Sequence, residues 1–359
     1  MAEIEYRGRR AHRLSNGVLT VTITVEGGHI ASILHAGADV NPLWTPQWPS
    51  MEPSAYDAAR HGGAYGGDAE AKLLAGIFGH NLCLDLFGGP SEAEAAAGMT
   101  VHGESSIALY EVEESPGALV ARSFFREAGL RFERRLALNP GSSVLRITEA
   151  VENVSACDRP SAWTQHVSLG APFVEPGVTQ FRLPGTRSKV LEADFAGGKG
   201  YQKIGAEFDW PMCPRADGGV TDLRLYPGDA RSAGYTATLM DPAREQAHFI
   251  GWHPKWKLAF GYAWKQTDFP WIGRWEENRL RELAPWDGRE ITCGMEFGVS
   301  PMPESRKQMI ERGSLFGVPG YRWLPARQKV TVEYCAFAAL AEKCPESPTW
   351  SGDSVRFDT

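Results

Sequence analysis

Apolar and polar residues alternate with a period of two along much of this chain. Between residues 130 and 138, leucine and phenylalanine recur on one set of alternate positions, and charged residues such as Arg131 and Glu133 occupy the other. Successive side chains of a β-strand point to opposite faces, so this spacing is typical of a half-buried antiparallel strand. Turn-forming residues at 127–129 and 139–142 bound the segment, which predicts a meander of short strands.

The same period predicts strands throughout the sequence. They fall at residues 18–25, 30–34, 118–125, 130–138, 144–151, 161–169, 179–183, 222–226, 235–240, 247–252, 257–264, 271–276, 290–297 and 329–337. Helical signals are few, and they lie at residues 54–60, 92–97 and 303–312. Many short strands with few helices predict an all-β sandwich or barrel. No repeat or composition break divides the chain, so we expect a single domain over residues 1–345 and a loose C-terminal tail at 346–359.

Residues 42–98 break the strand pattern. The segment carries Trp44, Trp48 and the glycine-rich run HGGAYGG at 61–67, and it continues into AGIFGHNLCLDLFGGP at 75–90. Long loops held at the surface by rigid strands generally carry function. We therefore expect this excursion to contribute to a binding site.

The charge balance excludes some classes of partner. The formal net charge is −7, so no basic excess is present to meet the phosphates of a nucleic acid or an anionic membrane. No apolar run approaches the ~20 residues of a membrane helix, and the N-terminus lacks the apolar core of a signal peptide. We expect a cytoplasmic monomer or homodimer that binds neither nucleic acid nor membrane.

Motifs for metals, cofactors and nucleophiles are missing. The six cysteines have no C-x-x-C spacing, which indicates scattered thiols rather than a disulfide framework or a zinc site. There is no G-x-S-x-G elbow, no Walker A loop and no G-x-G-x-x-G between a strand and a helix. The run His102-Gly103-Glu104 imitates the H-x-E of zinc deaminases, but no P-C-x-x-C follows it. We therefore expect no metal and no cofactor.

Three isolated polar residues, His102, His166 and Glu296, lie on or beside apolar strands. In the segment SAWTQHVSL, one face carries the tryptophan, valine and leucine, and the other carries Thr164, His166 and Ser168. Each of the three residues, taken alone, also fits a structural role as a hydrogen-bonded or ion-paired core group. Together, two imidazoles and a carboxylate form a minimal acid–base set that can move protons on and off oxygen near neutral pH.

The motifs around these residues resemble the galactose mutarotase-like superfamily, which includes the aldose 1-epimerases. The resemblance extends from about Ser15 to Pro301 and rests on the order of six motifs. They are EGGHIASI at 26–33, GHNLCLDLFGGPSE at 79–92, TVHGESS at 100–106, RFERRLALNPGSSVLRITEAVENVS at 131–155, WTQHVSLGAPF at 163–173 and ITCGMEFGVSP at 291–301. The resemblance implies a β-supersandwich of large antiparallel sheets with a sugar on its concave face.

The resemblance also implies roles for individual residues. His102, in the HG motif, would bind the sugar and orient its ring oxygen. His166 would act as the general acid on that oxygen, and Glu296 as the general base on the anomeric hydroxyl. Asp209 corresponds to an aspartate that contacts sugar hydroxyls.

This sequence departs from the family pattern at two places. The family arginine falls near His80 and Asn81, where this chain has none, so we expect these two side chains to meet the sugar there. The residues after His166 also differ from those of true mutarotases, so the resemblance implies no particular sugar. Further sugar contacts are expected from Arg274, Trp275 and Glu276. Five tryptophans are candidates either to stack on a sugar ring or to pack in the core: Trp44, Trp48, Trp271, Trp275 and Trp286.

These observations predict a carbohydrate-active isomerase that interconverts the α and β anomers of an aldose by acid–base ring opening. Two alternatives stay open. One is a non-catalytic sugar-binding protein on the same fold. The other is a different sugar enzyme, such as an epimerase at another carbon or a lyase, for which Arg274 and Arg279 are the candidate carboxylate ligands. A sugar phosphate is disfavoured because no cluster of basic residues marks a phosphate site.

Overall fold

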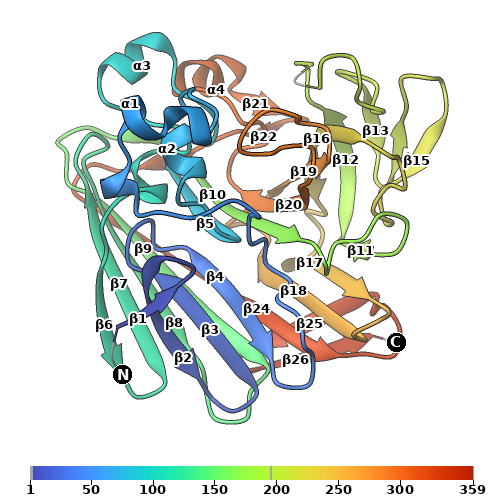
Figure 1. The fold of residues 1–359 in the computed structure, drawn as a ribbon, viewed down its shortest axis with the longest axis horizontal. Helices are drawn as coiled ribbons and strands as arrows, with labels where there is room; N and C mark the ends of the chain where they lie inside the picture. Colours follow the sequence, from blue (N-terminus) through green and yellow to red (C-terminus); the bar gives the residue numbers. More distant parts are fainter. Residues whose placement is uncertain (1–2, 195, 359) are drawn as a thin grey trace.

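Two large antiparallel sheets dominate the structure, a computed structural model that describes residues 3–194 and 196–358 (Figure 1). The twelve-stranded sheet has the order β1 (Ile4–Tyr6), β2 (Arg9–Ser15), β3 (Leu19–Thr24), β4 (Ile30–His35), β5 (His80–Asp85), β10 (Arg159–Gly170), β20 (Ile291–Gly298), β19 (Trp271–Asn278), β16 (Ser232–Met240), β12 (Gly185–Val190) and β13 (Glu207–Asp209), with β23 (Arg322–Leu324) also paired to β10. The eight-stranded sheet has the order β11 (Gln180–Arg182), β17 (Gln246–His253), β18 (Leu258–Lys265), β24 (Lys329–Leu340), β9 (Val144–Asn153), β8 (Leu130–Ala137), β7 (Ala118–Phe125) and β6 (Glu111–Ser115). The all-β sandwich predicted from the sequence is confirmed.

Strand β8 shows how the sequence builds these sheets. Leu130, Phe132 and Leu136 are buried, whereas Arg131 and Arg135 are exposed, as the alternation predicted. Antiparallel pairing with β7 on one side and β9 on the other completes the predicted meander. The one predicted strand that fails in large part is 222–226, because beyond β15 this segment makes only an isolated bridge to β11.

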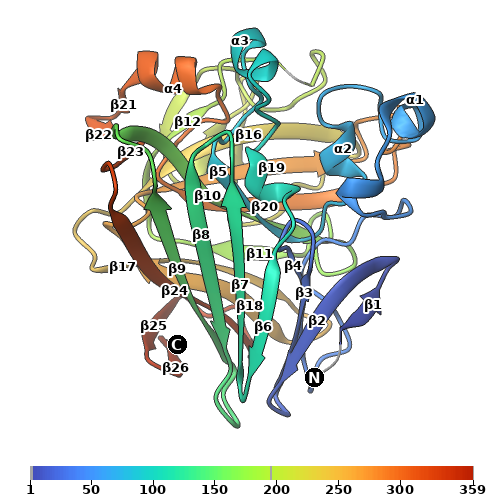
Figure 2. The same ribbon diagram turned by 90° about the vertical axis from the view of Figure 1, so that its left-hand side faces the viewer.

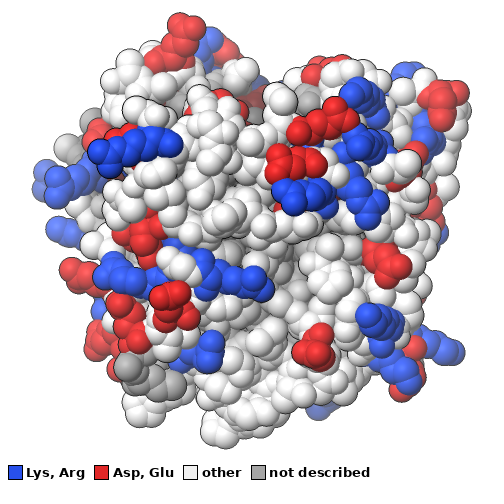
Figure 3. Space-filling model, viewed as in Figure 1, with Lys and Arg blue, Asp and Glu red and all other residues white. Residues whose placement is uncertain are grey.

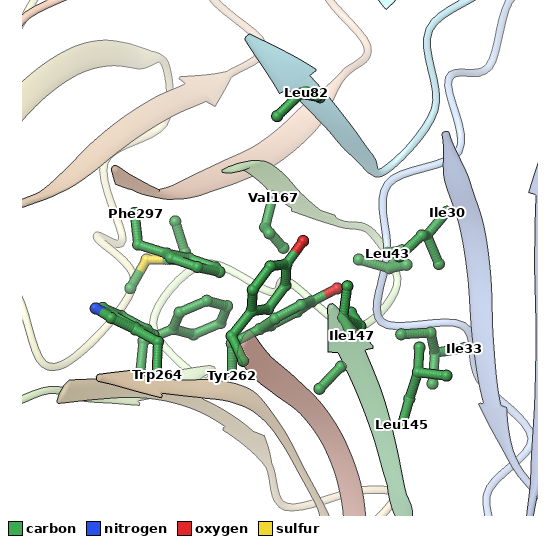
Figure 4. Packing of buried hydrophobic residues seen from close by; sticks show 14 of the residues in the cluster. Ile30, Ile33, Leu43, Leu82, Leu145, Ile147, Val167, Tyr262, Trp264 and Phe297 are labelled. Carbon is green, nitrogen blue, oxygen red and sulfur yellow. The ribbon is translucent and has the colours of Figure 1, made fainter. Parts of the chain in front are cut away.

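The main core lies between the two sheets (Figure 4). Leu82, Val167 and Phe297 face it from the twelve-stranded sheet, while Ile147 and Trp264 face it from the eight-stranded sheet. Phe297 stacks on Trp264 with ring centroids 4.2 Å apart. Aromatic pairs in this geometry contribute more than their buried area alone.

The helices are short and lie on the side of the twelve-stranded sheet that faces away from the eight-stranded sheet (Figures 1 and 2). They are α1 (Ala58–His61), α2 (Ala71–Leu74), α3 (Glu92–Ala96), α4 (Arg306–Arg312) and three 3₁₀ turns, η1 (Pro53–Ala55), η2 (Gly62–Ala64) and η3 (Glu104–Ser106). The predicted helix near 303–312 is therefore confirmed as α4. It begins at a capping box of Ser305 and Gln308 and ends at Gly313, whose φ of +67° stops the helix. No helix among the described residues is long and apolar enough to cross a membrane.

The C-terminal segment, expected as a loose tail, is a packed hairpin instead. Strands β25 (Ser347–Ser351) and β26 (Ser354–Asp358) pair with each other, and β25 contacts β17 and β18. Trp350, Val355 and Phe357 pack against a small apolar cluster on the outer face of the eight-stranded sheet. These apolar residues explain why the segment folds back onto the sheet. Two further hairpins are formed by β14 (Met212–Pro214) with β15 (Val220–Asp222) and by β21 (Ser314–Leu315) with β22 (Val318–Pro319).

Candidate active site

Four adjacent strands of the twelve-stranded sheet, β5, β10, β20 and β19, form the floor of the candidate site. On β10, Thr164 and Ser168 pair with two glycines of β20, so His166 lies opposite Glu296 between these pairs. Paired residues on neighbouring strands project from the same face of a sheet. The register therefore places the imidazole and the carboxylate side by side.

His166 projects away from the main core, as the alternation along SAWTQHVSL predicted. Trp163, Val167 and Leu169 are fully buried between the sheets, and Gln165 joins a buried polar network there. His166 is 6% exposed and opens onto a cavity on the other face of the sheet. One face of the strand thus packs in the core, and the other face carries His166 into the cavity.

His166 and Glu296 are in direct contact. His166 Nε2 lies 3.1 Å from Glu296 Oε1. Among the described residues, Glu296 Oε1 nonetheless accepts no well-aligned hydrogen bond. Gly294 leaves room for this carboxylate, because a Cβ at that position would clash with Glu296 Oε1. The two groups are close enough to exchange a proton, and the carboxylate oxygen still has capacity for a further hydrogen bond.

His102 is held beside this pair by an unusual backbone. Its φ is +62°, its N–H donates to the Gly88 carbonyl, and its own carbonyl accepts from the Leu84 N–H. The following residue must be Gly103, because its φ is +76° and a Cβ there would clash with the Leu84 carbonyl. This loop brings the His102 ring to 4.8 Å from the His166 ring, measured between centroids. The HG motif is thus needed to pack the loop against β5.

One hydrogen bond fixes the tautomer of His102. Its Nδ1 lies 2.6 Å from the Phe87 carbonyl oxygen, and a carbonyl can only accept, so Nδ1 carries the hydrogen. Burial also lowers the pKa of His102 to about 4. At neutral pH the ring is therefore uncharged, and Nε2 has a free lone pair. His102 can accept a hydrogen bond from a ligand hydroxyl but cannot donate a proton.

Burial shifts the pKa values of the contacting pair in opposite directions. It raises the pKa of Glu296 to about 8. Burial, followed by the proximity of His102, lowers the pKa of His166 well below its usual value. Both shifts favour the uncharged form of each group. Near neutral pH the pair consequently holds one proton.

The other nitrogen of His166 can serve as a donor or an acceptor. The Asn81 amide nitrogen lies 3.4 Å from Nδ1, and the Ser168 hydroxyl lies 3.3 Å from it. Asn81 donates to Nδ1 when that atom is bare, and Ser168 accepts from it when it is protonated. The surroundings of Nδ1 therefore accommodate both the imidazole and the imidazolium.

The three polar residues line one cavity of about 260 Å³, close to the lower end of the range for small-ligand sites. The wall above them comes mainly from the excursion at 42–98 and from the loop after β19. The lining residues are Trp44, Glu70, Leu73, Leu74, Ile77, Phe87, Gly88, Gly89, Val101, His102, His166, Leu191, Tyr235, Trp275, Arg281, Trp286, Glu296 and Pro303. The long excursion contributes to the cavity, as expected from its composition.

Tryptophans form one wall of the cavity. Trp44 stacks on Trp286 with centroids 5.7 Å apart, and Trp275 meets both edge-on. Trp275 also lies 6.4 Å from the His166 ring. Flat indole faces beside an acid–base pair suit the apolar face of a sugar ring. Trp48 packs behind this wall, and Trp271 belongs to a different cluster with Met302 and Leu315.

Several expected sugar contacts do not reach the cavity. Arg274 and Glu276 lie on the opposite face of β19 from Trp275, where they pair with each other and are fully buried. His80 is likewise on the core side of β5 and contacts the Tyr262 hydroxyl and Gln165. The cause is strand alternation, since adjacent residues of a strand cannot face the same way.

Two more expected contacts also lie outside the cavity lining. Asn81 is on the correct face of β5 but lies beneath the His166 ring, so it can position the imidazole rather than touch a ligand. Asp209 is exposed on β13, the edge strand of the sheet. The structure therefore brings together His102, His166, Glu296 and Trp275 among the predicted site residues.

Glu70 and Arg281 are cavity residues that sequence reasoning missed. Both lie in irregular segments, one before α2 and the other after β19, where no period marks a facing direction. Charged loop residues are usually solvated, so nothing in the sequence separated these two from the rest. Within the described residues, no group of three or more histidine, cysteine or acidic side chains is placed to hold a metal ion.

No protein-family model matches the chain, and no curated protein matches it in sequence. Similarity to solved structures is extensive. A candidate aldose 1-epimerase from Klebsiella pneumoniae has a TM-score of 0.64 at 15% identity, covering 90% of this chain and 77% of the other. A galactose mutarotase-like protein from Clostridium acetobutylicum has a TM-score of 0.58 at 11% identity, covering 94% and 98%.

A galactose mutarotase-like protein from Lactobacillus casei gives the same result, with a TM-score of 0.57 at 12% identity over 92% of this chain and 100% of the other. At such identities the similarity shows the fold. The supersandwich implied by the six sequence motifs is confirmed.

Proposed function

We propose that this chain, which has the galactose mutarotase-like fold, is an isomerase that interconverts the α and β anomers of an aldose. One observation carries the proposal: His166 Nε2 and Glu296 Oε1 lie 3.1 Å apart on the floor of a cavity that His102 and Trp275 also line. This arrangement supplies an acid, a base, a hydroxyl acceptor and an aromatic surface. Anomer exchange needs nothing else, because it transfers only protons and breaks one C–O bond.

Ring opening requires two proton transfers. Glu296, as the carboxylate, takes the proton from the C1 hydroxyl, and His166, as the imidazolium, gives a proton to the ring oxygen. The C1–O5 bond breaks as the C1 carbonyl forms. Rotation about C1–C2 then presents the other carbonyl face, and ring closure reverses both transfers and yields the other anomer. Each positioned transfer typically contributes ~10²–10⁴-fold to the rate.

The pair can begin this cycle without taking a proton from solvent. Burial favours the neutral acid and the neutral imidazole in the empty site. The reactive ion pair contains the same single proton, moved from Glu296 Oε1 to His166 Nε2. A sugar hydroxyl that donates to the carboxylate favours this shift. The Nδ1–H, which the neutral imidazole already carries when Nε2 is bare, can donate to the Ser168 hydroxyl throughout.

His102 and the tryptophans would hold the sugar rather than exchange protons with it. The free Nε2 lone pair of His102 accepts a sugar hydroxyl, because its Nδ1–H is committed to the Phe87 carbonyl. Trp275 offers its ring beside His166. Orientation of this kind is a large part of enzymatic rate enhancement.

Anomer exchange can be measured directly by polarimetry or NMR on fresh α-anomers of a panel of aldoses. We expect the wild-type chain to accelerate exchange for at least one aldose, and Glu296→Gln and His166→Ala each to lower kcat by at least ~100-fold. Glu282→Gln, an exposed residue outside the cavity lining, is the matched control and should leave the rate unchanged.

The same experiment separates the alternatives. No acceleration for any aldose, combined with sugar binding, would establish a non-catalytic binding protein. The lyase alternative loses its candidate carboxylate ligands, because Arg274 is buried on the far face of β19 and Arg279 is exposed outside the cavity lining.

A further inference from the structure

Arg281 is the only arginine or lysine among the described residues that line the cavity. It lies in the loop after β19 and is 31% exposed. Its guanidinium stacks over Trp286 at 4.5 Å from the ring centroid and lies 5.7 Å from that of Trp275. Because Trp275 in turn neighbours His166, the guanidinium is placed across the aromatic wall from the acid–base pair.

Two carboxyl groups from different segments face Arg281. Glu277 Oε2 lies 3.4 Å from Arg281 Nε, and Glu70 Oε2 lies 3.9 Å from Nη1. Glu277 is buried, and its other oxygen accepts the backbone N–H groups of Leu280 and Arg281, so it fixes the loop. Glu70 is 44% exposed and comes from the excursion at 42–98. The positive charge of Arg281 is thus compensated from two sides.

The donors of Arg281 are nevertheless unused. In residues 3–194 and 196–358, its guanidinium makes ion-pair contacts but donates no hydrogen bond to the protein, and none of its nitrogen atoms is a buried, unsatisfied donor. A guanidinium has five N–H donors in a planar fork. These donors are therefore available to acceptors on a ligand, and the guanidinium lies over the Trp286 ring.

We propose that Arg281 is a specificity-determining residue for the epimerase reaction and that Glu70 restricts it to uncharged sugars. The inference rests on the proposed function for its ligand class. Arg281 donates to hydroxyls remote from C1, while Glu70 and Glu277 balance its charge. A carboxylate or phosphate on the sugar would have to displace Glu70, and apart from Arg281 the described cavity lining offers it no arginine or lysine. An anion would lose its hydration without gaining a free cation.

The test compares a neutral aldopyranose with the uronic acid and the 6-phosphate of the same configuration. Rates of anomer exchange give kcat/KM. Quenching of tryptophan fluorescence by the corresponding methyl glycosides, which cannot open, gives binding separately from catalysis. Wild type should favour the neutral sugar in both measurements. Glu70→Gln, which keeps the shape and removes the charge, should raise the anion-to-neutral ratio about tenfold by freeing Arg281 for a charge-assisted hydrogen bond.

Arg281→Met and Glu282→Gln complete the set. Arg281→Met keeps an apolar stem over Trp286 but removes the guanidinium donors. It should therefore lower kcat/KM for the neutral sugar about tenfold or more. In the double variant with Glu70→Gln, it should abolish the increase in the anion-to-neutral ratio. Glu282→Gln removes one negative charge, as Glu70→Gln does, but from the loop that carries Arg281. Glu282 pairs with Arg231 outside the cavity lining, so this variant should leave the anion-to-neutral ratio unchanged.

Three results would overturn the inference: equal or better use of the anionic sugars by wild type, no change of the ratio in Glu70→Gln, or an equal change in Glu282→Gln. Failure of the proposed function looks different. In that case no sugar shows accelerated exchange, while the methyl glycosides still bind and the Glu70→Gln shift in binding ratio still supports the role of Arg281.

Discussion

Glu296 and His166 share one proton because burial penalises the charged form of each. At neutral pH an exposed carboxyl would be ionised, and an exposed imidazole would be partly protonated. Here the pKa of Glu296 is raised to about 8, and the pKa of His166 is lowered well below its usual value. The one-proton state therefore extends over a wide pH range, and it is the state that the proposed reaction requires.

This protonation predicts the pH dependence of activity. As the pH rises through about 8, Glu296 loses its proton. The pair then has no proton to give to the ring oxygen of the sugar, so kcat/KM should fall about tenfold per pH unit. As the pH falls, activity should persist below the usual pKa of histidine, because protonation of His166 is disfavoured. The measurement is kcat/KM against pH after subtraction of the uncatalysed rate. The shared-proton assignment would be contradicted if kcat/KM declined at the ordinary pKa of histidine as the pH falls, or if it did not decline above pH ~9.

Alternation explains which site residues could be predicted. His166 shares the polar face of its strand with Thr164 and Ser168, and Glu296 is the one charged residue of β20, so their facing direction follows from their neighbours. The same rule shows that Trp275 and Glu276 cannot both meet a ligand, and it separates His80 from Asn81. Arg281 could not be found in this way, because it lies in a loop and acts through contacts with a residue far along the chain.

At the scale of elements, four strands are joined beneath the site by a buried polar network. Glu149 on β9 accepts from Arg134 Nε on β8 at 2.8 Å, from the Gln165 amide on β10 at 2.7 Å and from the Tyr334 hydroxyl on β24 at 2.7 Å. The strand that carries His166 is thereby tied through the core to the eight-stranded sheet. The sequence predicted these strands, but it did not predict the network, because pairing across sheets leaves no periodic signal.

Arg134→Met should destabilise the protein strongly. The change leaves the Glu149 carboxylate buried without its countercharge, so we expect the free energy of unfolding to fall by ~3–5 kcal/mol. Arg122→Met on β7 is the control, because Arg122 pairs with Glu133 on the exposed face and should cost ~1 kcal/mol or less. Urea unfolding of both variants measures the difference. Equal losses would show that the buried pair contributes no more than a surface one.

At the scale of the whole molecule, the face that is viewed in Figure 1 carries interspersed charges of both signs. Figure 3 shows acidic and basic side chains side by side over this face, without a continuous field of either sign. The net charge of −7 is small for a chain of 359 residues. Such a surface attracts no particular charged ligand over a distance.

Salt should therefore have little effect on the reaction of an uncharged sugar. We expect kcat/KM to change less than about twofold between ~20 mM and ~500 mM monovalent salt, since neither partner has a long-range field to screen. Initial rates at constant pH provide the measurement. A steep decline with salt would indicate an anionic or cationic substrate instead.

The position of β10 between β5 and β20 has a consequence for biosynthesis. His166 meets Asn81 from the earlier part of the chain, but its partner Glu296 follows only after several intervening strands. A nascent chain that has emerged from the ribosome as far as β19 contains both histidines of the acid–base set, His102 and His166, but it still lacks the base, Glu296. The pair of His166 and Glu296 would thus be assembled in a single late event, when β20 docks between β10 and β19.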